Sequence, residues 1–169
     1  MDDTQSHAEA YPGWHLAQVN IATMRAPLED PLMQRFVDQI DFINALADRS
    51  PGFVWRLQTE EGDATAVRAY DDACILFNLS VWESIGALHD YVYRSAHLEV
   101  LKDRKQWFEP MQQRHMALWW VPAGHLPSVE EARDRLEHLQ KNGPTPQAFT
   151  FQRRFAPPDT AVASARAGR

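Results

Sequence analysis

The stretch Leu76-Phe-Asn-Leu-Ser-Val-Trp-Glu83 decides the fold, because it predicts a β-strand whose two faces carry different chemistry. Side chains alternate along a strand. Every second residue from Phe77 is apolar, whereas the intervening positions hold Asn78, Ser80 and Trp82. Uncharged polar groups of this kind suit a half-enclosed pocket better than a solvated surface. The stretch therefore predicts a sheet with one core face and one chemical face.

Two further strands show a similar division of their faces. Residues 15–22 place Gln18 and Asn20 on one face and apolar side chains on the other. Residues 53–58 set Trp55 and its apolar neighbours against a polar face. The same pattern in separate segments indicates that their polar faces belong to one surface of the sheet.

Composition favours a single globular domain. The chain has 169 residues, 44% of them hydrophobic, which is enough for a full core. Cys74 is the only cysteine, so no intramolecular disulfide or cysteine-based zinc site can form. The net charge of −6 argues against nucleic acid as a partner. Neither a signal peptide nor a membrane-length apolar run is visible, so a cytoplasmic protein without membrane contact is expected. We expect a domain over 14–155, with disordered tails at 1–13 and 156–169.

Helical and strand patterns follow one another in a recognisable order. After the first strand, helical spacing runs from Asp30-Pro31 to Ser50. The remaining elements are expected as a strand from 53, a strand from 76, helices over 83–93 and 97–108, a strand over 115–121, a helix from the capping box at 128–131, and a last strand over 147–155. The β-α-β-β-α-β order predicts an α+β fold, the ferredoxin-like split βαβ sandwich with an antiparallel sheet.

Helices in this fold cover one face of the sheet, so the other face needs a cover. The sheet of a second subunit would supply one and would enclose the polar surface. We therefore expect a homodimer, in the form of a dimeric α+β barrel, with the cavity on its inner sheet face.

Several long segments resemble a bacterial family of unknown function. They are 15–22, 44–48, 50–56, 80–84, 118–125 and 143–151, and the resemblance spans about 14–151. The family looks like a member of the dimeric α+β barrel superfamily. That superfamily includes antibiotic-biosynthesis monooxygenases, haem-degrading monooxygenases and many proteins without known activity. The resemblance implies the fold, and by analogy an oxygenase.

The haem-degrading branch offers a residue-level comparison. The asparagine on the first strand of that branch matches Asn20. The segment 81–84 resembles the start of the helix that follows its third strand. The branch's second tryptophan falls at Tyr91, and its haem ligand falls near Leu101. His97 lies one helical turn earlier, so haem binding would need a shifted geometry.

The residues expected to act are Asn20, Trp82 and His97: the amide orients substrate or oxygen, the indole packs on it, and the imidazole acts as base or as haem axial ligand. Residues expected to bind substrate are Gln18, Asn78, Ser80, Trp55, Tyr91, His115 and Trp119. Two structural alternatives stay open. His97 can instead fix a helix end, and the polar side chains can form a seam at the dimer interface.

The favoured hypothesis is a monooxygenase-like enzyme that acts on a small apolar or aromatic molecule, with haem as a candidate cofactor. The alternative is a non-catalytic dimer that binds a small molecule or presents an interaction surface. A metal site without haem would need at least two of His89, His97 and His115 to converge. The basic cluster Arg94, Lys102, Arg104 and Lys105 is interpreted as a solvated helix face, and Arg56 as an ion-pair partner of Asp48.

Overall fold

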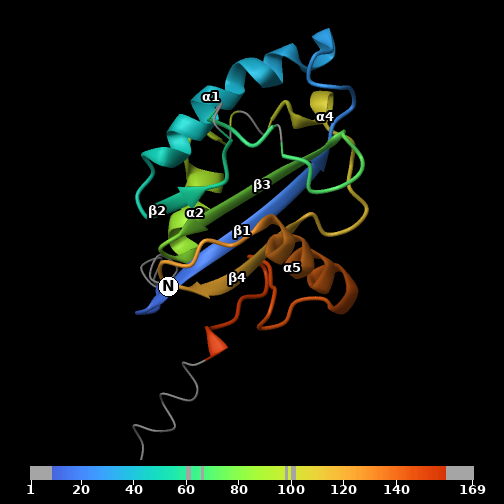
Figure 1. The fold of residues 1–169 in the computed structure, drawn as a ribbon. Coiled ribbons are helices and arrows are strands. Elements are labelled where there is room, and N and C mark those ends of the chain that lie inside the picture. Colours follow the sequence, from blue (N-terminus) through green and yellow to red (C-terminus); the bar gives the residue numbers. More distant parts are fainter. Residues whose placement is uncertain (1–8, 60–61, 66, 98, 100–101, 159–169) are drawn as a thin grey trace, which may run out of the picture.

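Four antiparallel strands form one sheet in the order β2-β3-β1-β4 (Figure 1). The computed structural model describes residues 9–59, 62–65, 67–97, 99 and 102–158. The strands are β1 (Trp14–Thr23), β2 (Phe53–Arg56), β3 (Ile75–Trp82) and β4 (Met116–Pro122). With β1 and β3 central, this is the predicted ferredoxin-like arrangement.

The helices that the structure reports are η1 (Pro31–Met33), α1 (Gln34–Asp48), α2 (Ile85–Arg94), α4 (Arg104–Trp107) and α5 (Val129–Asn142). Helices α2 and α5 begin at a serine cap. The Ser84 hydroxyl accepts from the Ala87 amide at 3.0 Å, and the Ser128 hydroxyl accepts from the Glu131 amide at 3.0 Å. Each cap satisfies a backbone donor that the first helical turn leaves unpaired.

Helices α1 and α2 pack on the polar face of the sheet. Ala47 of α1 and Leu88 of α2 share a core with Leu16, Trp82 and other residues of that face. The polar face is therefore covered within one chain. The expectation that a partner subunit's sheet would enclose it is wrong. Alternation in the sequence separates the two faces but does not say which helices cover each one.

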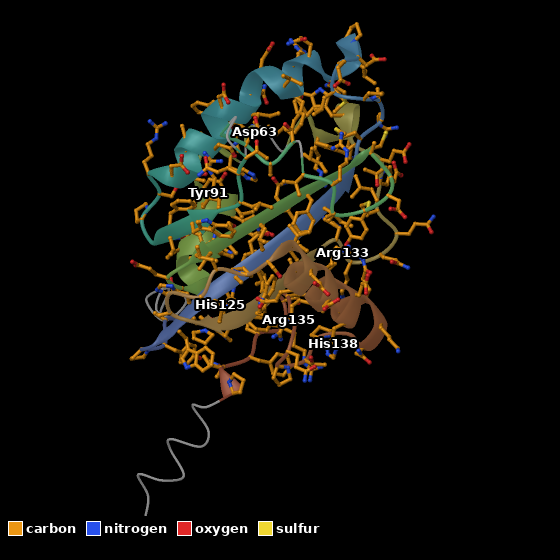
Figure 2. All side chains as sticks on the ribbon, in the orientation of Figure 1. Asp63, Tyr91, His125, Arg133, Arg135 and His138 are labelled. Atoms are coloured by element: carbon orange, nitrogen blue, oxygen red, sulfur yellow. The ribbon has the colours of Figure 1, made fainter. Side chains whose placement is uncertain are left out.

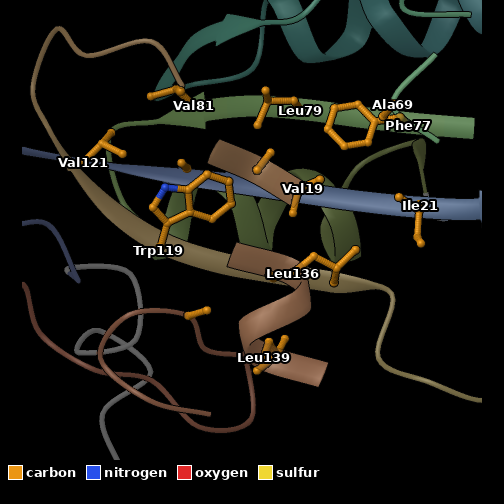
Figure 3. Packing of buried hydrophobic residues seen from close by; sticks show 14 residues of the cluster. Val19, Ile21, Ala69, Phe77, Leu79, Val81, Trp119, Val121, Leu136 and Leu139 are labelled. Atoms are coloured by element: carbon orange, nitrogen blue, oxygen red, sulfur yellow. The ribbon is translucent and has the colours of Figure 1, made fainter. Parts of the chain in front are cut away.

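Helix α5 packs on the opposite, apolar face. Leu136 and Leu139 meet Val19, Trp119 and Leu79 there (Figure 3). Every residue of this core is at most 6% exposed. The face thus has its cover in α5 and in the segment around Ala69, which removes the reason for expecting a second subunit on it.

Two expected segments differ from the prediction. Over 147–155 the described backbone makes only an isolated bridge between Phe149 and Leu118, together with a local bridge between Thr145 and Ala148. Bends around Thr150 and Arg153 prevent a continuous strand. The helix expected over 97–108 is interrupted: residues 97 and 99 are helical, residues 102 and 103 form a turn and α4 follows, while residues 98, 100 and 101 lie outside the described residues.

The N-terminal boundary also differs. Residues 9–13, expected in a tail, contact the domain: Tyr11 packs edge-on against Trp120, and Glu9 pairs with Arg154. Of the two expected tails, residues 1–8 and 159–169 lie outside the described residues. No helix of the described chain is long and apolar enough to cross a membrane.

Candidate functional site

A cavity of about 430 Å³ lies between the polar face of the sheet and helix α1. Strands β1 and β3 form its floor, and Phe36, Ile40 and Ile43 of α1 form its roof. Tyr91 and Asp63, labelled in Figure 2, lie on this side of the sheet, whereas His138 lies across it with α5. The volume suits a small ring system, since ligand pockets typically span about 300–1,000 Å³.

The floor is a ladder of hydrogen-bonded side chains across β1 and β3. Strand register places Asn20 opposite Asn78 and Gln18 opposite Ser80. Asn78 donates to Asn20 at 3.2 Å, and Asn20 donates to Gln18 at 3.1 Å. Gln18 and the Trp82 indole both donate to the Ser80 hydroxyl, at 3.0 and 2.9 Å. The polar side chains predicted from the sequence are therefore one connected group.

This ladder leaves hydrogen-bond donors uncommitted. Each carboxamide has two N–H groups, and one of them is used within the ladder. The Ser80 oxygen accepts twice, so its own hydrogen is available. If the amides were turned the other way, each would still keep an N–H. The floor is thus suited to an oxygen atom that carries negative charge.

Aromatic rings close one end of the cavity. Trp82 stacks on Tyr91 with ring centroids 5.1 Å apart and meets Phe53 edge-on at 5.3 Å. The Tyr91 hydroxyl donates to the carbonyl oxygen of Ile43 at 3.3 Å. Burial raises the pKa of Tyr91 far above its usual range, so the phenol stays protonated and acts as a wall rather than as a base.

His97 lies beside this wall and lines the cavity. Its ring centroid is 4.9 Å from that of Tyr91, and its backbone amide donates to the Ser95 hydroxyl at 3.1 Å. The Nδ1 atom is buried without a hydrogen-bond partner among the described residues. Burial lowers the pKa of His97, so the imidazole is neutral at pH 7 and able to accept a proton.

His115 and Arg104 also line the cavity. Burial, with the positive charge of Arg104 as a further cause, lowers the pKa of His115. The same charge contributes to the lowered pKa of His97. Arg104 is half-buried, unlike the exposed Lys102 and Lys105, so the solvated-face interpretation is wrong for this member of the basic cluster. A sequence pattern cannot separate it from its neighbours, because α4 is a single short turn.

Two predicted substrate-binding residues lie elsewhere. Trp55 and Trp119 belong to the apolar core under α5 and do not line the cavity. The Trp119 indole donates to Glu131 at 3.1 Å, which satisfies its polar atom inside that core.

The predicted ion pair of Arg56 with Asp48 is confirmed, at 2.7 Å. His89 packs against Tyr93 and Phe151 instead of joining the other histidines.

The described residues include no group of three or more His, Cys, Asp or Glu side chains that could hold a metal ion. Haem binding in this cavity would depend on a single histidine as the iron ligand. His97 and His115 line the cavity and are the residues that would supply an axial ligand. Haem therefore stays an untested prediction.

Comparisons with known proteins give distant structural likenesses. The cofactor-independent oxygenase SnoaB from Streptomyces nogalater gives a TM-score of 0.43 at 17% identity, over 68% of this chain and 98% of its own. A protein of unknown function from Nitrosomonas europaea gives 0.42 at 10% identity, over 69% and 97%. A proposed antibiotic biosynthesis monooxygenase from Chloroflexus aurantiacus gives 0.40 at 9% identity, over 68% and 98%. Likeness at this level carries no inference about activity.

No curated protein matches the sequence. Residues 15–165 match the family model described as a domain of unknown function, DUF3291. The match covers most of the chain, and it agrees with the resemblance seen in the sequence to a family of unknown function. The chain belongs to the DUF3291 family.

Proposed function

We propose that the protein is a monooxygenase-like enzyme that binds a small aromatic molecule in the cavity under α1 and oxidises it with dioxygen. The observation that carries the proposal is the donor-rich ladder of Gln18, Asn20, Asn78 and Ser80 beneath an aromatic and aliphatic enclosure. Such a floor stabilises a phenolate or enolate oxygen, and this electron-rich form of a substrate is the one that reacts with dioxygen.

Each residue has a distinct role in this proposal. His97 takes the proton from the substrate, since its imidazole is neutral at pH 7. Asn20 and Asn78 hold the resulting oxyanion through their uncommitted N–H groups. Trp82 packs on the ring and is fixed in place by its hydrogen bond to Ser80. Haem, if it binds, would add redox chemistry at His97 or His115, but none of these roles needs it.

The test is dioxygen uptake by the purified protein with 1,8-dihydroxyanthrone as the probe, a fused phenol with an acidic C–H group. Asn20→Ala is compared with Asn142→Ala, a matched change of an exposed asparagine at the end of α5. We expect Asn20→Ala to lower the rate by about a hundredfold, the usual cost of losing one oxyanion donor. Asn142→Ala should leave the rate unchanged.

Equal rates in both variants would refute the role of the ladder. Probe binding without dioxygen uptake would favour the alternative, a non-catalytic small-molecule-binding protein.

A haemin titration of the wild-type protein and of His97→Ala decides whether haem is a cofactor. A saturable absorbance band that changes in the variant would support haem, and diffuse absorbance that is the same in both would remove it. A homodimer also stays a prediction, although helices of the same chain cover both faces of the sheet.

A further inference from the structure

Arg104 brings a positive charge into the wall of the cavity. Its side chain is half-buried and lines the cavity together with Trp107 and Phe108. Its guanidinium makes no hydrogen bond or ion pair with any residue that the structure describes. An arginine that lines a cavity without a carboxylate partner is available to an anionic ligand, because such a ligand offsets the cost of partly withdrawing the charge from water.

No carboxylate among the described residues of the cavity lining forms an ion pair with Arg104. Asp63 is the one carboxylate among the described lining residues, and it accepts hydrogen bonds from the amide and hydroxyl of Thr65. The other lining arginine, Arg56, is neutralised by Asp48. The electrostatic neighbours that Arg104 affects are His97 and His115, which have no negative charge to offer.

A second polar atom of the cavity lining is also without a partner. Gln39 of α1 lines the cavity, and its side-chain oxygen is buried without a hydrogen-bond partner among the described residues. Buried polar atoms are normally paired, so an orphan on a cavity wall indicates a partner that comes from inside the cavity, a ligand or a water. An acceptor such as this oxygen fits a hydroxyl or N–H group on the ligand.

We propose that the cavity is built for an aromatic acid, with the ligand's carboxylate held by Arg104 and its ring enclosed by the aromatic and aliphatic side chains that line the cavity. Arginine is suited to this role, since its planar fork binds both carboxylate oxygens at once. The inference rests on the proposed function, of which it names the substrate class, and it assigns Arg104 as the residue that determines specificity.

The experiment compares two probes of the same shape, 2-naphthoate and naphthalene-2-carboxamide, which differ in charge. Binding is followed by calorimetry for the wild-type protein, Arg104→Gln and Lys105→Gln. Lys105 is the matched control, because it is the next residue on α4 and is exposed. We expect the wild-type protein to bind the acid about tenfold or more tightly than the amide, the usual effect of a charge-assisted hydrogen bond.

Arg104→Gln should remove that preference and leave amide binding unchanged, whereas Lys105→Gln should preserve it. Equal affinities of the wild-type protein for both probes would overturn the inference about Arg104 while leaving the aromatic cavity in place. Binding of neither probe would overturn both the inference and the proposed function. The wild-type comparison needs no variant, so it decides the question even if Arg104→Gln fails to fold.

Discussion

Ser80 is the junction of the cavity floor, because its oxygen accepts from both Gln18 and Trp82. These donors belong to side chains that are 4% and 1% exposed, so water replaces the lost partner poorly. We predict that Ser80→Ala lowers the free energy of unfolding by about 2 kcal/mol, the cost of leaving buried donors unpaired. Urea unfolding measures it. Ser80→Thr, which keeps the hydroxyl on a strand, is the control and should retain most of the stability.

Because His97 and His115 are buried in the cavity wall, we predict that the free energy of unfolding depends on pH. Burial lowers the folded-state pKa of His97 and His115, whereas the unfolded chain keeps the ordinary value. The unfolded state therefore binds more protons below about pH 6.5. The free energy of unfolding should fall as pH is lowered from about 7 to 5, and less steeply in His97→Gln/His115→Gln. Parallel slopes in the wild-type protein and the variant would contradict the burial of these imidazoles.

The sequence identifies the polar residues of the floor but not the cation of the wall. Asn20, Asn78 and Ser80 follow from strand alternation, because a period of two assigns each residue to a face. Trp55 and Trp119 show the limit of that reasoning, since their faces belong to the core under α5. Arg104 lies on one short turn with no periodicity to read.

At the level of elements, the turn from α1 into β2 approaches α2 closely at Gly52. This residue has a φ of 81°, and an added Cβ would lie 2.5 Å from the Cβ of Ala87. We predict that Gly52→Ala lowers the free energy of unfolding by about 2–4 kcal/mol, since backbone strain and overpacking add. Chemical denaturation with circular dichroism is the measurement.

Gly124→Ala separates the two causes. Gly124 has a φ of 95°, and an added Cβ would meet no atom within 4 Å. This control carries the backbone strain alone and should cost about 1 kcal/mol. Equal losses in both variants would mean that the contact between the turn and α2 contributes nothing.

Element order was predictable because caps and periodicities are local signals. The strand expected over 147–155 was not realised, since only Phe149 reaches β4. The phenylalanines of that segment pack on the same face as Trp120 and Trp82, so their apolar pattern reflects burial against the sheet rather than a strand. Hydrophobic alternation over a short segment does not distinguish these outcomes.

For the whole molecule, both faces of the sheet are covered by helices of the same chain. Folding should therefore not require a partner. We predict that the urea midpoint stays constant over about a hundredfold range of protein concentration, as for a monomer whose core is complete. A midpoint that rises with concentration would show that subunit association contributes to the fold, as the sequence analysis first expected.

The ladder on the cavity floor also has a direction. Each side chain donates to the next, from Asn78 through Asn20 and Gln18 to Ser80, so their dipoles add head to tail. Turning one amide would oppose two like groups, so all of them must turn together. A charge placed near Asn78 therefore polarises every hydrogen bond of the row. This includes the bond from the Trp82 indole to Ser80 at the far end.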